Sequence, residues 1–158
     1  MAERGINAYQ IGLCLSAQVI SLALTKPMMG RVSDRHGRPP QIFAGALLGA
    51  ASIGGFALFG SFVPFALMSI FFGVSMSTLT SATSAFVADL SHGARGSAMG
   101  MRGSILDIGH TTGPIVAGMV AGSLGYRFSF VTAATVLICI AILFAVALGK
   151  SGERQPHA

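Results

Sequence analysis

The chain has 158 residues, of which 53% are hydrophobic and 9% are charged, and its formal net charge is +5. Soluble globular domains carry about 25% charged residues, so this composition excludes an ordinary water-soluble domain and predicts an all-α integral membrane protein. The basic residues lie at the ends of apolar runs, a placement typical of membrane topology, and they do not predict nucleic-acid binding.

Three runs without Asp, Glu, Lys or Arg are long enough to cross a bilayer. They cover residues 5–25, 39–88 and 128–149. A membrane-spanning helix needs about 20 apolar residues, so the second run holds two helices joined by a turn. Gly60 and Pro64 mark that turn, because glycine and proline interrupt helices.

In chain order, we therefore expect five transmembrane helices in a single partial membrane domain over residues 1–158. Their expected bounds are 8–29, 41–60, 63–90, 98–124 and 127–148, and a polar cytoplasmic tail follows at 149–158.

The Lys and Arg residues predict how these helices cross the membrane. Eight fall on one side and two on the other, and the more positive side is cytoplasmic. The N-terminus is then outside and the C-terminus cytoplasmic. We also expect Asp89, near the cytoplasmic end of the third helix, to pair with Arg95. The eight are Lys26, Arg31, Arg35, Arg38, Arg95, Arg102, Lys150 and Arg154, and the two are Arg4 and Arg127.

The turn between the first two expected helices has the sequence GRVSDRHGRPP, at residues 30–40. Topology alone needs only a few basic residues, whereas this turn also places glycines and an aspartate at set spacings. The pattern Gly-x-x-x-Asp-Arg-x-Gly-Arg resembles the signature loop of the major facilitator superfamily of secondary transporters. The matching residues are Gly30, Asp34, Arg35, Gly37 and Arg38.

A second motif follows in the fourth expected helix. The pattern Gly-x8-Gly-x3-Gly-Pro-x2-Ala-Gly resembles the antiporter motif of the same family, with Ala117 where the motif prefers glycine. The proline removes a backbone donor, so the helix is expected to bend, and the glycines let a neighbouring helix approach. The alternative is close packing without any motion. The matching residues are Gly100, Gly109, Gly113, Pro114 and Gly118.

The resemblance implies a fold of twelve helices in two six-helix halves, of which this chain would supply most of one half. The five helices match either helices eight to twelve or helices two to six of the family. We favour eight to twelve, because only a short tail follows the last helix. The N-terminal half of the transporter, or another membrane partner, would then be missing from this chain.

The resemblance also implies a role for the signature loop. In the family, its aspartate lies near the cytoplasmic end of a helix from the other half, where a helix dipole attracts an anion. Basic residues beside it latch the two halves, so Asp34 and its arginines are candidates for gating. The alternative is that Asp34 caps the second helix and the arginines only set topology.

Asp107 is the one acid placed well inside an apolar run, and His110 follows on the same helix face. A charge at the middle of a membrane helix costs roughly 2.5–3.5 kcal/mol on insertion scales, so such residues usually face a cavity or a partner. The two are candidates for carrying the proton that drives export. The alternatives are a packed polar pair, or an Asp107 close enough to the interface to be solvated.

Hydroxyl side chains concentrate in the third expected helix. By resemblance this is the tenth or fourth helix of the family, which lines the central cavity. Serine and threonine can instead bond to the preceding turn of their own helix, so both interpretations stay open. The candidates for cavity lining are Gln18 on the first helix and Ser77, Thr80, Ser81 and Ser84 on the third.

The leading functional hypothesis is secondary transport of a small molecule by alternating access, in the form of proton-coupled export. The alternatives are a non-transporting membrane subunit that pairs with another half-transporter, and an inactive truncated fragment. The sequence contains no nucleotide-binding loop, metal cluster or nucleophile–base pair that would indicate an enzyme, and we expect no cofactor or metal. The expected setting is the lipid bilayer of a bacterial inner membrane, with a small-molecule substrate.

Overall fold

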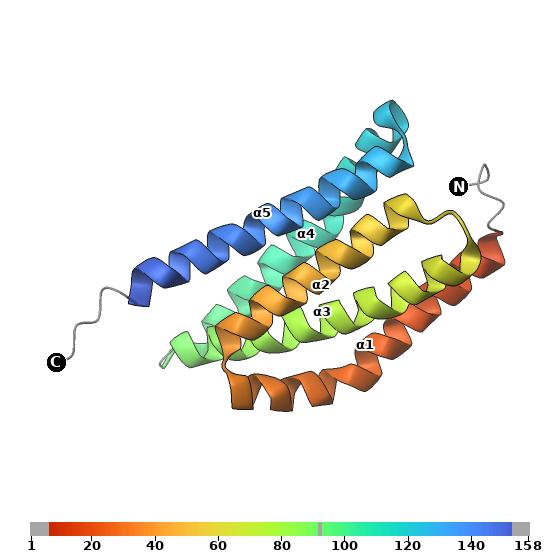
Figure 1. The fold of residues 1–158 in the computed structure, drawn as a ribbon. Coiled ribbons are helices and arrows are strands. Elements are labelled where there is room, and N and C mark those ends of the chain that lie inside the picture. Colours follow the sequence, from red (N-terminus) through yellow and green to blue (C-terminus); the bar gives the residue numbers. More distant parts are fainter. Residues whose placement is uncertain (1–6, 92, 153–158) are drawn as a thin grey trace.

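The computed structural model describes residues 7–91 and 93–152 as five α-helices (Figure 1). The predicted all-α fold is confirmed, and the described residues contain no strand. Part of the expected tail, residues 153–158, lies outside the described residues, whereas 149–152 continue the last helix. The helices are α1 (Ala8–His36), α2 (Arg38–Leu58), α3 (Phe62–Leu90), α4 (Arg95–Leu124) and α5 (Tyr126–Gly152).

Within the described residues, four of the five expected membrane helices are long and apolar enough to cross a membrane: α1, α2, α3 and the Tyr126–Leu148 part of α5. α4 has a similar length, 30 residues, but Arg95, Arg102 and Asp107 lower its hydropathy. Large apolar side chains are exposed on all five helices. In a bilayer these side chains meet lipid, so an outward-facing apolar surface is what a membrane bundle requires.

The turn expected at residues 30–40 is much shorter in the structure. α1 continues to His36 and α2 begins at Arg38, so Gly37 alone separates the two helices. Gly37 has a φ of +88°, which glycine adopts without steric cost. Pro39 fits the first turn of α2, where its missing N–H is not needed. The expected end of the first helix at Met29 was too early, because the charges mark the end of the apolar run and not of the helix.

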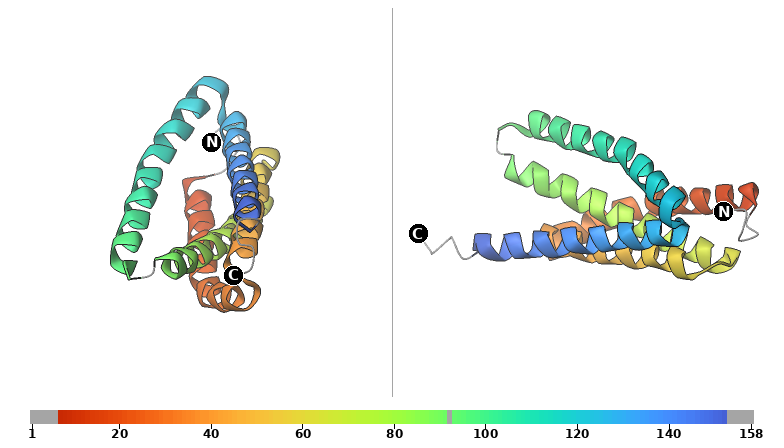
Figure 2. Two further views of the ribbon diagram at one scale, coloured as in Figure 1. Left: turned by 90° about the vertical axis from the view of Figure 1, so that its left-hand side faces the viewer. Right: turned by 90° about the horizontal axis from the view of Figure 1, so that it is seen from above.

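α3 lies between α1 and α2, and α2 also packs against α5. α4 runs beside α5 and has fewer contacts with α3. Figure 2 shows α4 leaning away from the other helices and curving along its length. None of its residues is buried. The chain therefore forms a four-helix core with α4 as an open flank.

Small residues make the closest contacts within this core. Ser75 of α3 is fully buried, and its Oγ donates to the carbonyl oxygen of Gly45 in α2 at 2.8 Å. Gly73 of α3 approaches α1 so closely that an added Cβ would lie 2.3 Å from the carbonyl oxygen of Gln18. Such small-residue contacts let membrane helices pack without a large apolar core.

The two ends of the bundle differ in chemistry. At one end, the ring of Phe56 in α2 lies 4.5 Å from that of Phe65 in α3 and 5.7 Å from that of Phe130 in α5, measured between centroids. At the other end lie the α1–α2 and α3–α4 links (Figure 1). We call this second end the basic end, because all described Lys and Arg side chains except Arg127 belong to the helix halves that meet there.

Candidate functional site

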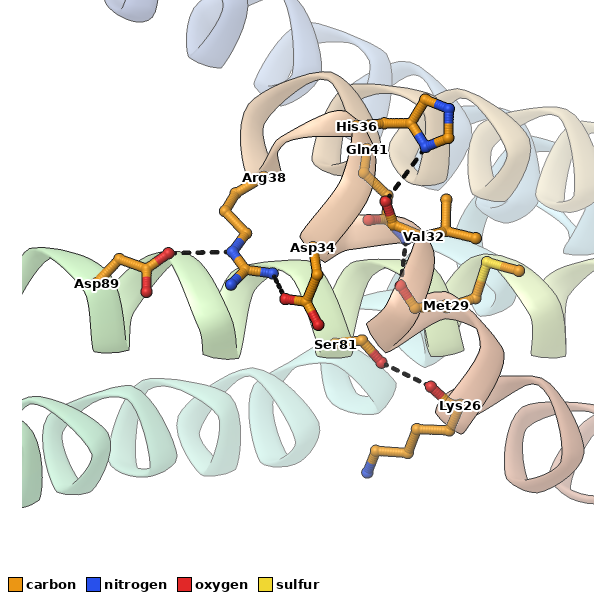
Figure 3. A network of polar contacts seen from close by, with 9 residues as sticks. All are labelled: Lys26, Met29, Val32, Asp34, His36, Arg38, Gln41, Ser81 and Asp89. Atoms are coloured by element: carbon orange, nitrogen blue, oxygen red, sulfur yellow. Dashed lines mark hydrogen bonds and ion pairs between the residues drawn. The ribbon is translucent and has the colours of Figure 1, made fainter.

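The signature motif forms a charged cluster at the basic end (Figure 3). The guanidinium of Arg38, the first residue of α2, donates from Nη1 to Oδ1 of Asp34 in α1. Its Nε donates to Oδ2 of Asp89 in α3 at 3.0 Å. One arginine therefore ties the last turns of α1 and α3 to the first turn of α2.

The cluster is only partly shielded from its surroundings. The Arg38 side chain is 23% exposed, whereas those of Asp34 and Asp89 are 65% and 57% exposed. Water and salt screen such pairs, so each contributes only about 0–1 kcal/mol to stability. A contact of this strength positions three helix ends and still breaks at low cost.

Two further hydrogen bonds hold the second half of α1 against its neighbours (Figure 3). Nε2 of Gln41 in α2 donates to the carbonyl oxygen of Met29 at 2.8 Å, and Oγ of Ser81 in α3 donates to that of Lys26 at 3.4 Å. Gln41 is buried, and its Oε1 has no partner among the described residues. Gln41 was not among the residues predicted from the sequence, because a lone glutamine in an apolar run gives no sign of its partner.

The other motif residues at this end lie outside the cluster. Arg35 is exposed and forms no ion pair within the described part of the chain. An added Cβ at Gly30 would meet open space. The expected pairing of Asp89 with Arg95 is wrong, because Arg38 binds Asp89 and Arg95 is exposed at the start of α4.

The antiporter-like motif lies on α4, the open flank. No atom outside the helix backbone comes within 4 Å of a Cβ added at its four glycines, in contrast to Gly73 of α3. Pro114 lies inside α4 without ending the helix, which curves as expected (Figure 2). The close packing anticipated at these glycines is therefore not made by the described helices. The four are Gly100, Gly109, Gly113 and Gly118.

Asp107 and His110 are both exposed on α4. Neither side chain has a hydrogen bond or ion pair within residues 7–91 and 93–152. Thr111 Oγ1 donates at 2.8 Å to the backbone oxygen of Asp107 and not to its carboxylate. At 1.5 Å per residue, Asp107 lies about 18 Å along α4 from its first residue. An acid is therefore presented well inside the length of the helix, on a surface that no described helix covers.

The hydroxyl side chains of α3 that were predicted to line a cavity differ in their hydrogen-bond partners. Oγ1 of Thr80 donates to the carbonyl oxygen of Met76 at 2.7 Å, and Oγ of Ser84 donates to that of Thr80 at 2.6 Å. These two bond to the preceding turn of their own helix. Ser77 is fully buried, and its Oγ has no partner among the described residues.

The remaining cavity-lining candidates both lie along the contact between α1 and α3, at different heights. Ser81 is partly exposed and bonds to the backbone of α1. Gln18 is half-buried, and its backbone carbonyl is the group that Gly73 approaches.

An apolar cavity of about 630 Å³ lies between α4 and α5, with Ile53 of α2 in its wall. Gly109 and Gly113 of the antiporter-like motif line it from α4. Ser129 of α5 lines the other side, and its Oγ donates to the carbonyl oxygen of Ala117 at 3.0 Å. This volume is in the range of cavities that hold small molecules.

Arg102 of α4 was predicted from the sequence only to set membrane topology, and the structure gives it specific partners. Its Nη2 donates to Oγ1 of Thr83 in α3 at 3.2 Å and to the carbonyl oxygen of Thr80 at 3.4 Å. These bonds join α4 to α3. Its position well inside a helix, away from the turn, was the sequence feature that could have indicated a contact with another helix.

Comparisons with known proteins agree with the motifs. A family model described as Major Facilitator Superfamily matches residues 1–158. The chain is 29% identical to the multi-drug resistance efflux pump PmrA of Streptococcus pneumoniae, over 86% of this chain and 34% of that protein. It is 32% identical to multidrug resistance protein 2 of Bacillus subtilis, over 92% of this chain and 36% of that protein.

A third relative is the class C tetracycline resistance protein of Escherichia coli, which is 25% identical over 94% of this chain and 38% of its own length. The chain thus spans about a third of the length of the curated relatives it matches. Within the described residues, no group of three or more His, Cys, Asp or Glu is placed to hold a metal ion.

Proposed function

The chain belongs to the Major Facilitator Superfamily, and we propose that it forms part of a proton-coupled exporter of small, partly apolar molecules. Members of this family are transporters and not enzymes. The observation that carries the proposal is the position of Asp107, an acid presented inside the length of the motif helix α4. Similarity to two multidrug resistance proteins supports export as the direction.

In this proposal, Arg38 is a latch. Its bonds to Asp34 and Asp89 hold the basic ends of α1, α2 and α3 together in one state of the transport cycle. In the other state the bonds break, and Asp34 turns to the N-terminal end of a helix outside this chain, where the helix dipole favours an anion. The high exposure of both carboxylates supports a contact that opens and closes at low cost.

Asp107 takes up and releases the coupling proton, and His110 shares it from one helical turn further on. Ionisation of an acid at this depth is costly unless water or a partner reaches it. The substrate would occupy the cavity between α4 and α5, close to the same helix. Gln18 and Ser81, which are partly exposed, are the strongest candidates for the polar lining of the central path.

Further helices would cover α4. Its exposed glycines, and relatives of which the matched part of this chain covers only 34–36%, support helices contributed by the same polypeptide or by a partner. We assign the chain to helices eight to twelve of such a transporter. The excess of Lys and Arg at the basic end supports a cytoplasmic location for that end, and the bacterial relatives support a bacterial cell membrane.

Everted membrane vesicles test the proposed function. Respiration acidifies the interior of vesicles that contain the protein. Ethidium, a lipophilic cation, is then added outside. We expect ethidium to accumulate, the pH gradient to fall on its addition, and a protonophore to abolish the uptake. Vesicles without the protein are the control. If a panel of lipophilic cations and tetracycline is taken up no faster than in that control, the protein is a non-transporting subunit or an inactive fragment.

A further inference from the structure

A second charged site includes neither the residues of the proposed gating cluster nor Asp107. A groove of about 400 Å³ runs between α3 and α4, and its walls are apolar except for Arg102 and Thr83. Val87 lines it from α3, and Ala98, Met101 and Ile105 line it from α4. Arg102 is the charged residue among those that line the groove, and a charge among apolar side chains is favoured when an anion pairs with it.

Arg102 is held in place by α3. Thr83 Oγ1 donates to the carbonyl oxygen of Leu79 at 2.5 Å, so the lone pairs of its hydroxyl are available to accept from Arg102. Both bonds that Arg102 makes within the described residues use Nη2. A guanidinium has five N–H donors, so the donors of Nε and Nη1 remain for a ligand.

No carboxylate in the described chain supplies that anion. The structure describes three acidic residues, and two of them, Asp34 and Asp89, are bound by Arg38. The third, Asp107, lies five positions further along α4 and so on a different face from Arg102. The arginine is therefore fixed in position while its charge is uncompensated.

The depth of the groove identifies the kind of ligand. Arg102 lies about 10 Å from the start of α4, and Thr83 lies about the same distance from the end of α3. Both are thus near the level where head groups meet acyl chains on the side rich in Lys and Arg. Basic pockets between membrane helices at this level suit lipid head groups, and arginine binds phosphate through two parallel hydrogen bonds.

We propose that Arg102 binds the phosphate of an anionic membrane lipid whose acyl chain lies in the groove between α3 and α4. The lipid neutralises the arginine and fills the space between α4 and the helix core. The ligand chemistry is an anionic head on an apolar chain, and the membrane is its source. The site uses neither the residues of the gating cluster nor Asp107, so its test does not depend on the proposed proton coupling.

Native mass spectrometry of the detergent-purified protein tests this site with added dioleoyl phosphatidylglycerol and dioleoyl phosphatidylcholine. We expect phosphatidylglycerol to bind in preference, and Arg102→Gln to weaken its binding about fivefold, as expected for one basic group near a lipid head. Arg95→Gln removes an exposed charge from the start of the same helix and should leave binding unchanged. Ala98→Leu, which narrows the groove without altering any charge, should weaken binding and so gives a second readout if Arg102→Gln misfolds.

A second binding experiment with a water-soluble alkyl phosphate distinguishes a soluble anion from a membrane lipid as the ligand. Decyl phosphate has the same kind of head on a short single chain. Binding of decyl phosphate that depends on Arg102, without binding of phosphatidylglycerol, would overturn the lipid assignment. Equal losses from Arg95→Gln and Arg102→Gln, or equal binding of phosphatidylcholine by the unmodified protein, would overturn the site itself.

Discussion

Nε of Arg38 and Oδ2 of Asp89 lie 3.0 Å apart, although 51 positions separate the two residues in the chain. The contact joins the first turn of α2 to the last turn of α3. The same guanidinium also binds Asp34 at the end of α1. Because these bonds are partly exposed, they add little to the stability of the fold, and in the proposed transport cycle they act as a latch.

Asp89→Asn tests this latch. We expect the free energy of unfolding to fall by no more than about 1 kcal/mol, since the pair is half exposed. The same energy applied to a two-state equilibrium shifts its populations about fivefold, so proton-driven ethidium transport should slow by a similar factor. Thermal unfolding in detergent and flux in proteoliposomes give the two values. If Asp89→Asn transports as fast as the Arg95→Gln control, the pair is not a latch.

Substitution of Gly73 tests the close contact between α1 and α3. Gly73→Ala would place a Cβ 2.3 Å from the carbonyl oxygen of Gln18, so α1 and α3 must separate. We expect a loss of about 1–3 kcal/mol in stability. Gly54→Ala is the matched control, because no atom outside its own stretch of helix lies within 4 Å of its added Cβ, and alanine favours helix over glycine by up to about 1 kcal/mol. Equal thermal unfolding midpoints for the two variants would contradict the close α1–α3 contact.

The class of fold was predictable from the sequence for a simple physical reason. A bilayer excludes charge, so long runs without Asp, Glu, Lys or Arg mark membrane helices directly. The boundary at Gly37 was not predictable in the same way. A helix can extend beyond its apolar segment, because charged residues are compatible with helix outside the bilayer. α1 accordingly continues through Asp34 to His36.

The contacts between helices were much less predictable. The partner of Asp89 depends on the rotation of α3 relative to α2, and hydropathy does not encode this rotation. The bond between Arg102 and Thr83 depends in the same way on how α4 faces α3. The motif residues Asp34 and Arg38 were recognised from their spacing alone, but their shared link to Asp89 required the fold.

Gly118→Leu tests whether another helix covers α4. Outside its own stretch of helix, no atom lies within 4 Å of a Cβ added at Gly118, and this residue does not line the cavity between α4 and α5. We expect the leucine variant to reach normal levels in the membrane but to lose transport, because a covering helix requires a small residue there. Gly118→Ala should have a milder effect. Transport at the unmodified rate in Gly118→Leu would mean that this face of α4 meets lipid.

The size of the native protein tests the proposal of further helices. An antibody raised against residues 149–158 would detect the protein in native membranes. Because the chain covers 34% of the length of a relative, we expect a band at roughly two to three times 16.2 kDa. A band at 16.2 kDa would instead direct attention to a separate membrane partner, which co-purification with the same antibody would identify.

The role of Asp107 is tested most directly by comparing two transport modes of Asp107→Asn in proteoliposomes. Driven transport uses an imposed pH gradient, whereas exchange of labelled for unlabelled ethidium needs alternating access but no net proton movement. We predict that Asp107→Asn loses driven transport and keeps exchange, because the amide cannot release a proton. Driven transport by Asp107→Asn at the rate of the unmodified protein would contradict proton coupling through this residue.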